Sequence, residues 1–244
     1  MTARAFVTDA GIEVPAITTG QMREVDRVAI EEVGPNLYQM MENGGRNLAL
    51  TVLDRLGDDW PSTPIAVLAG TGGNGGGGIC AARHLANRGA DVTVVISEQE
   101  QLTPVPREQL AVYRGTPGKL VQAGELGVLK PGLVVDAVIG YSLGGAPRGI
   151  ARRMIDWMGD QPVPVISLDV PSGIDSRTGE PLGSHVQAAA TLTLALPKTG
   201  LDADAAGDVM LADIGIPAEV YRRVGIAVPV GLFGSRYRVA LRPI

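Results

Sequence analysis

The chain has 244 residues, of which 45% are hydrophobic, and a formal net charge of −5 at pH 7, so it can form one α/β domain with a sizeable core. Lysine and arginine never occur in runs longer than two, which argues against the basic patch of a nucleic-acid-binding protein. The single cysteine, Cys80, excludes a disulfide framework and zinc-ligand spacing, and we expect it to be a small buried side chain.

The N-terminal residues 1–17 are expected to form an arm. Residues 18–244 are expected to form a single domain, because no low-complexity linker or internal repeat divides them. The arm lacks the basic-then-apolar pattern of a targeting segment, and no run of about 18 apolar residues, the length that spans a membrane, occurs in the sequence. These features predict a soluble, cytoplasmic protein.

Apolar runs alternate with helical patterns along the rest of the chain. Helices are expected over residues 18–33, 37–56, a stretch after the glycine-rich segment, part of 100–116, and 150–158. Strands are expected over residues 65–69, 92–96, 133–136, 164–168, 190–196 and 208–213, with residues 228–233 as an edge strand or tail. Largely apolar strands separated by helices are typical of a parallel sheet that helices cover on both faces.

Seven glycines fall within the nine residues Gly70 to Gly78, between an apolar run and a helical pattern. Such a strand, turn and helix direct backbone N–H groups and a helix N-terminus at a bound anion, usually a phosphate. Glycine in a helix interior is about 1 kcal/mol less favourable than alanine, so the run Gly75 to Gly78 indicates that something approaches the backbone closely. A surface loop without a ligand is the alternative.

The spacing of these glycines also admits a nicotinamide-dependent dehydrogenase, with Glu98 as the acid near the end of the second strand. A P-loop is excluded because no Gly-Lys-Ser/Thr follows. Hydride transfer would also need a catalytic constellation, and the two histidines, His84 and His185, are expected to be structural or solvated.

Four expected strand ends carry polar or glycine-rich sequence, at residues 70–78, 136–149, 169–175 and 197–200. The carboxyl ends of parallel strands meet at one edge of a sheet, where ligands bind, so we expect these segments to converge. A single aspartate at a strand end is commonly a turn former, but two of them, Asp136 and Asp169, favour a functional role.

The side-chain oxygens of Asn74, Asp136 and Ser172 would suit a hard cation. Lys198, which follows the strand over residues 190–196, is open to three interpretations: contact with a phosphate, pairing with an acid, or surface charge.

Several segments also follow a known pattern. They are QMREVDRVAIEEVG with MMENGGRN, then GTGGNGGGGICAARHL, VVDAVIGYSLGGAPRG, LDVPSGIDSRTGE and LALPKTGL. In this order they resemble the YjeF N-terminal domain family, the NAD(P)H-hydrate epimerases, over about residues 18–215. The resemblance implies a Rossmann-like three-layer αβα sandwich with a mostly parallel sheet. It also implies an isomerase of nicotinamide nucleotide repair, which interconverts the R and S forms of hydrated NADH or NADPH.

The resemblance also assigns residues to roles. It implies a potassium ion held by Asn74, Asp136 and Ser172. It implies Asp169 as the acid/base group, with Lys198 setting its charge environment. The implied substrate contacts are Gly73, Asn74, Gly75, Gly76, Gly77, Gly140, Tyr141, Ser142, Leu143, Gly144, Gly145, Ala146 and Asp169. The family is often homodimeric, and a separate dehydratase can act in the same pathway.

Two positions depart from the family pattern. Its Asn-Asn-Gly-Gly-Asp becomes Gly73-Asn74-Gly75-Gly76-Gly77, which removes one amide and one carboxylate, and its Phe-Gly-Thr-Gly becomes residues 139–142, Ile-Gly-Tyr-Ser. Two alternatives to the epimerase therefore stay open. One is a non-catalytic nucleotide-binding or dimerisation module of the same fold, and the other is an enzyme that acts on a different nucleotide-like or small-molecule substrate.

Overall fold

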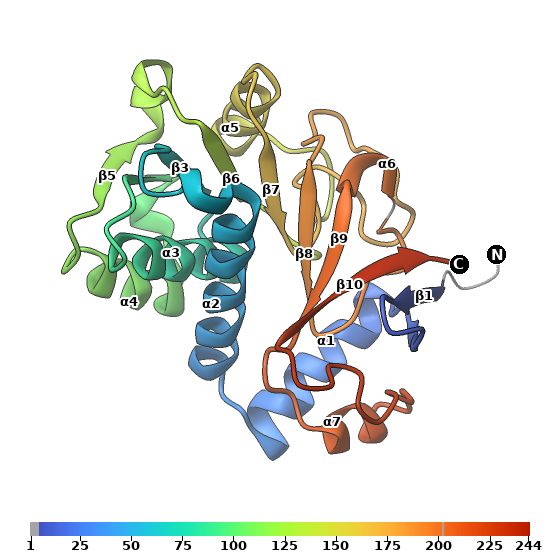
Figure 1. Ribbon diagram of the computed structural model, residues 1–244. Helices are drawn as coiled ribbons and strands as arrows, with labels where there is room; N and C mark the ends of the chain where they lie inside the picture. Colours follow the sequence, from blue (N-terminus) through green and yellow to red (C-terminus); the bar gives the residue numbers. More distant parts are fainter. Residues whose placement is uncertain (1–4, 202) are drawn as a thin grey trace.

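The computed structural model describes residues 5–201 and 203–244. Within them, ten strands form one sheet in the order β2-β1-β10-β9-β8-β7-β6-β3-β4-β5 (Figure 1). The strands are β1 (Ala5–Thr8), β2 (Glu13–Pro15), β3 (Ile65–Ala69), β4 (Val92–Ile96), β5 (Lys119–Gln122), β6 (Leu133–Ala137), β7 (Val165–Leu168), β8 (Ala190–Leu194), β9 (Asp208–Ala212) and β10 (Arg238–Pro243). The run from β9 to β5 is parallel, whereas β10, β1 and β2 add an antiparallel edge.

The α-helices are α1 (Thr19–Val28), α2 (Leu37–Leu56), α3 (Gly73–Ala86), α4 (Pro104–Tyr113), α5 (Gly149–Gly159), α6 (Ala203–Ala206) and α7 (Ala218–Arg223). Helices α2, α3 and α4 pack side by side against one face of the sheet, and α1 lies beside α7 (Figure 1). The apolar face of α5 belongs to a second core cluster on the other face. The protein is therefore a three-layer αβα sandwich with a mostly parallel sheet, which confirms the predicted fold class.

Strand β3 shows why the parallel strands are apolar throughout. Its residues Ile65, Val67 and Ala69 belong to the core cluster shared with α2 and α3. The alternate residues, Ala66 and Leu68, belong to the cluster shared with α5. Because successive side chains of a strand point to opposite faces, a strand covered on both faces must be apolar at every position.

Local capping fixes where the first two helices begin. The side chain of Thr18 accepts a hydrogen bond from the Gln21 backbone N–H, and Asn36 does the same with Gln39. In both pairs the glutamine side chain caps the first residue in return, which is a capping box. Helix α2 has the predicted bounds, and α1 continues through a π-helical turn, Ala29–Val33, to Gly34.

The structure differs from the expectation in three places. Residues 228–233 form turns, and the last strand is β10, which pairs with β9 and β1. Strand β5 was not expected. The arm contributes β1 and β2 to the sheet edge, while residues 1–4 of the arm lie outside the described residues. No helix among the described residues is long and apolar enough to cross a membrane.

The strand order reverses at β3, and this positions the site. After β3 the chain adds β4 and β5 on one side, and then returns to add β6, β7, β8 and β9 on the other. The helix after β3 packs with the α2 face, whereas α5, after β6, belongs to the opposite face. The connections that leave β3 and β6 therefore diverge and open a crevice at their carboxyl ends.

Candidate functional site

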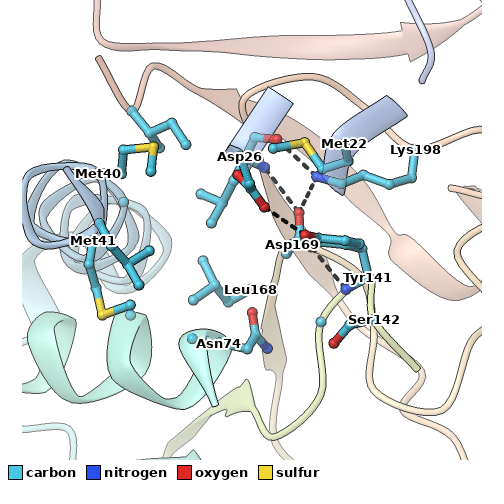
Figure 2. A pocket seen from close by; sticks show the side chains of 17 residues that line it. Met22, Asp26, Met40, Met41, Asn74, Tyr141, Ser142, Leu168, Asp169 and Lys198 are labelled. Carbon is cyan, nitrogen blue, oxygen red and sulfur yellow. Dashed lines mark hydrogen bonds and ion pairs between the residues drawn. The ribbon is translucent and has the colours of Figure 1, made fainter. Parts of the chain in front are cut away.

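A cavity of about 230 Å³ lies at this crevice. All four predicted strand-end segments contribute to its wall, through Asn74, Gly140, Asp169 and Lys198 among others. Figure 2 shows the charged groups on one side of the cavity and Met40 and Met41 of α2 across from them. The predicted convergence of the segments is confirmed.

The glycine-rich segment is helical from Gly73 onward, since α3 begins there. The close approach that its glycines indicated is made by the protein itself. A Cβ at Gly75 would collide with the Gly70 carbonyl, and one at Gly76 would lie 2.5 Å from the Met41 sulfur. Of the predicted contacts in this segment, Gly73, Asn74 and Gly77 line the cavity, while the other two glycines are buried behind it.

Asp136, at the end of β6, is fully buried, with 0% of its surface exposed. Its carboxylate accepts hydrogen bonds from the Ser172 hydroxyl at 2.6 Å and backbone N–H at 2.8 Å, and from the Ser167 hydroxyl at 2.8 Å. Burial raises the pKa of Asp136 despite these hydrogen bonds. The structure thus brings Asp136 and Ser172, two of the three predicted metal ligands, into direct contact.

Asn74, the third predicted metal ligand, lies near the loop that follows β6. A Cβ at Gly140 would sit 3.0 Å from the Asn74 Oδ1 and 3.2 Å from the Asp169 Oδ2, so glycine at 140 lets both side chains approach. The Asn74 amide nitrogen is buried and has no hydrogen-bond partner. Ser172 ties the same loop down, because its hydroxyl accepts from the Ile139 N–H at 2.8 Å. These are oxygen-rich surroundings with one unsatisfied polar group.

Asp169, just past β7, adopts a left-handed backbone conformation with φ of 71°. This conformation is unfavourable for a residue other than glycine, and such strain concentrates at functional sites. Its N–H bonds the Leu192 carbonyl of β8 at 2.8 Å. Its carboxylate accepts from the Tyr141 N–H at 3.1 Å and forms an ion pair with Lys198. The strained backbone thus aims the carboxylate across the cavity edge.

Lys198 is 1% exposed and Asp169 is 3% exposed, so their ion pair is buried. The lysine ammonium also donates to the Leu194 carbonyl at 2.9 Å. The N-terminal arm holds the backbone here, because Ile17 donates to the Pro197 carbonyl at 2.8 Å and accepts from the Thr199 N–H at 3.0 Å. Of the three interpretations of Lys198, the structure shows pairing with an acid.

The loop after β6 contributes Gly140, Tyr141 and Ser142 to the cavity wall. The remaining predicted contacts of this loop, Leu143, Gly144, Gly145 and Ala146, lie outside the lining.

Sequence reasoning missed the groups that α1, α2 and other elements bring to the cavity. They are Met22, Asp26, Leu37, Met40, Met41, Gly44, Leu168, Leu194 and Ile214. Asp26 had a detectable signal: it stands four residues after Met22 and three before Ala29, so it shares their apolar helix face. A carboxyl group within a buried stripe is rarely there for packing.

The remaining chemistry-bearing side chains lie away from the cavity. Cys80 is buried, and burial raises the pKa of its thiol to about 12. His84 bonds Glu42 at 2.8 Å, and the same carboxylate pairs with Arg83, which ties α3 to α2. His185 contacts the Gly183 carbonyl at 3.0 Å. These contacts agree with the structural roles predicted for the cysteine and the histidines.

Comparison with known proteins places this geometry in a family. Residues 37–200 match the family model described as YjeF-related protein N-terminus. An NAD(P)H-hydrate epimerase of Dehalogenimonas lykanthroporepellens is 46% identical over 224 residues, which cover 92% of this chain and 91% of that protein. A bifunctional NAD(P)H-hydrate repair enzyme, Nnr, of Salinibacter ruber is 36% identical over 86% of this chain, which spans only 42% of that longer protein.

A solved structure supports the fold. The crystal structure of yeast ynu0, YNL200c, superposes with a TM-score of 0.79, covers 93% of this chain and 100% of its own, and shares 22% sequence identity. The fold, the matched residues and the extent of the similarity agree, and the chain belongs to the YjeF-related N-terminal family.

Proposed function

We propose that this protein is an NAD(P)H-hydrate epimerase, an isomerase that interconverts the R and S forms of hydrated NADH or NADPH. The observation that carries the proposal is the buried pair of Asp169 and Lys198 on the wall of a cavity at the strand-order reversal. A relative at 46% identity over 92% of the chain bears this name, which supports the same assignment.

The reaction needs little beyond a proton-transfer group and a shaped pocket. The hydroxyl at C6 of the hydrated ring leaves as water while the ring nitrogen donates its lone pair, and water returns to the other face. Departure needs a proton delivered to the hydroxyl oxygen, and the return of water releases one; Asp169, paired with Lys198, is the group placed to exchange this proton. A fixed carboxylate of this kind contributes about 10²–10⁴ in rate.

The cavity suits the reacting end of the substrate. Its volume of about 230 Å³ is below the roughly 300–1,000 Å³ of sites that enclose a drug-sized ligand, so the nicotinamide ring enters and the rest of the dinucleotide stays outside. Met40 and Met41 provide an apolar surface for the ring opposite Asp169 (Figure 2). The N-terminus of α3, next to the cavity at Gly73, is placed to receive the pyrophosphate.

A potassium ion fits the residues beside this position. Asn74, Asp136 and Ser172 supply oxygen donors with a single carboxylate, a set that suits a hard cation rather than zinc. Rotating the Asn74 amide by half a turn would place its oxygen at the buried position that now lacks a partner, where a cation would satisfy it. When bound, the ion would offset the charge of the pyrophosphate.

Assembly and context follow the family expectation. We expect a homodimer in the cytoplasm and a separate dehydratase acting on the same hydrates. Two longer relatives are named bifunctional NAD(P)H-hydrate repair enzymes, which supports a second activity on the same hydrates.

The proposal is tested by following one purified epimer of hydrated NADH, and separately of hydrated NADPH, by chromatography. We expect the protein to accelerate equilibration of the two epimers at catalytic concentration. An unchanged rate, with folded protein that still binds a dinucleotide by calorimetry, would instead support the non-catalytic binding module. Binding without epimerisation is the outcome that rejects the enzyme.

A further inference from the structure

Two carboxyl groups line the cavity among the described residues, Asp169 and Asp26. Figure 2 shows them on the same wall, with Tyr141 and Lys198 around them. They come from distant parts of the chain, since Asp26 stands on α1 and Asp169 follows β7. Their partners differ, and this difference points to different tasks.

The Asp169 carboxylate is fully engaged. One oxygen receives the Lys198 ammonium and, at 3.4 Å, the Leu194 N–H, and the other receives the Tyr141 N–H. Each partner donates a hydrogen bond to the Asp169 carboxyl group, and Lys198 also forms an ion pair with it. A carboxylate with these partners is suited to be the base in one direction of the reaction. In the reverse direction it returns the proton that it has gained to the leaving hydroxyl.

Asp26 has the opposite surroundings. No lysine or arginine forms an ion pair with it among the described residues, and one of its oxygens accepts a hydrogen bond from the Tyr141 phenol at 2.6 Å. Its second oxygen accepts no hydrogen bond from the described part of the chain. Burial, with the nearby Asp169 charge, raises the pKa of Asp26, which favours the protonated acid.

Tyr141 is the element that joins the two groups. Its backbone N–H bonds Asp169, its phenol bonds Asp26, and its ring lies 5.7 Å from the Lys198 ammonium. Tyr141 is thus held by hydrogen bonds at its backbone and at its phenol. Tyr141 belongs to the loop where the sequence departs from the Phe-Gly-Thr-Gly pattern of the family.

We propose, building on the proposed epimerase function, that Asp26 is the general acid of the reaction and that Tyr141 positions it. The Asp26 carboxyl proton passes to the C6 hydroxyl oxygen, the C6–O bond breaks, and the ring nitrogen lone pair forms a C=N bond as water leaves. Water then adds to C6 from the other face and gives its proton to Asp169. Solvent in the cavity returns a proton to Asp26 and removes one from Asp169.

This division of labour follows a general rule. Where two titratable groups stand in environments that favour opposite protonation states, they act as the acid and the base. The two epimers carry their hydroxyl on opposite ring faces, so one proton must be delivered where the hydroxyl leaves and another removed where water returns. A second proton-bearing group on the wall meets that requirement.

The test uses the full chain and purified epimers. Asp26→Asn is expected to lower kcat by about 10²–10⁴ with KM near the wild-type value. The matched control is Glu24→Gln, which removes an exposed acid of the same helix and should leave kcat unchanged. Asp26→Glu should recover part of the lost activity, and thermal melting reports whether each variant is folded.

The pH profile separates an acid from a structural residue. The titratable groups that face Asp26 are Tyr141, Asp169, Lys198 and Tyr221. We expect kcat to fall as pH rises through the Asp26 pKa. The Tyr141 hydrogen bond lowers that pKa, so Tyr141→Phe should shift the fall of kcat, the alkaline limb of the pH profile, to higher pH. If Tyr141 had only a structural role, this limb would stay at the same pH.

The outcomes are distinct. If the wild-type protein does not epimerise either hydrate, the proposed function fails. If it does, and Asp26→Asn stays within about tenfold of wild type, a range below the usual contribution of a general acid, the proposal for Asp26 is overturned. If Tyr141→Phe leaves the pH limb unmoved, Tyr141 is not the positioning residue. Should Asp26→Asn not fold, Asp26→Glu and Tyr141→Phe decide through the same profile.

Discussion

The ends of β6 and β7 are neighbours in the sheet, and each carries a buried aspartate, yet the two residues are held in different ways. Asp136 continues the regular strand, pairs in register with Ser167 and is surrounded by hydroxyl and N–H donors. Asp169 turns out of its strand with a positive φ and faces a buried lysine. Identical side chains one strand apart thus form a hydrogen-bonded cluster with hydroxyl and N–H donors in one case and an ion pair in the other.

The backbone accounts for the difference. A regular strand end keeps Asp136 inside the sheet, where it accepts hydrogen bonds from the segment that follows β7. The left-handed turn at Asp169 instead directs its carboxylate toward the cavity, where Lys198 arrives from β8. The comparison teaches that aspartates at strand ends indicate which edge of the sheet carries the site. The role of each aspartate depends on the direction in which the backbone after the strand turns its carboxylate.

Removing the acidic group at the end of β7 should have the largest effect on turnover. Asp169→Asn is expected to lower epimerisation turnover by about 10²–10⁴, because the amide cannot take up a proton. Affinity for a dinucleotide should stay near wild type, since the side chain keeps its shape. Steady-state kinetics on pure epimers and calorimetry measure the two effects. A loss below about tenfold would leave Asp169 as a contact residue.

Breaking the ion pair from the other side should mainly affect stability. Lys198→Met leaves a buried, uncompensated carboxylate, which costs about 3–5 kcal/mol. Urea denaturation measures the free energy of unfolding. The double variant Lys198→Met with Asp169→Asn removes the orphaned charge and should recover much of that loss. Equal stability of the single and double variants would contradict a charged pair.

The cluster at the end of β6 should respond less, and in a cation-dependent way. Asp136→Asn places an amide among donors and leaves at least one of them unsatisfied, which costs about 1–3 kcal/mol. Potassium chloride should raise the melting temperature of the wild type above that in lithium chloride of equal ionic strength, because a bound ligand stabilises the folded state. The variant should lose this difference. A wild type indifferent to the cation would argue against the potassium site.

The smallest effect on stability is expected at Asp26, whose pKa is raised mainly by burial. Its folded pKa lies above the reference value of 3.8, so the stability it contributes is fully present below the unfolded pKa and is lost as pH rises through the folded pKa. Asp26→Asn should therefore be more stable than wild type at neutral pH, with the difference shrinking in acid. Urea denaturation of both proteins across a range of pH measures this difference in the free energy of unfolding. A difference that grows in acid would contradict a raised pKa of Asp26.

Local rules explain what could be predicted from the sequence. The bounds of α2 follow from its Asn36 cap and Gly57 end. Apolar runs located the central strands because they are buried on both faces. In contrast, β5 has no buried residue and β10 has two, Val239 and Leu241. At or near the sheet edge the apolar pattern is weak, and pairing partners decide whether a strand forms.

The sequence by itself determined the family, the sandwich and the four segments that converge on the cavity, because periodicity and motif spacing are encoded locally. It did not contain the partners of the side chains at the site. Only the tertiary structure brought Asp26 from α1 to Tyr141, placed Ile17 of the arm against the Lys198 loop, and filled the space beside the glycines with Met41. These contacts join residues far apart in the chain, so packing of the three layers decides them, and no local pattern records them.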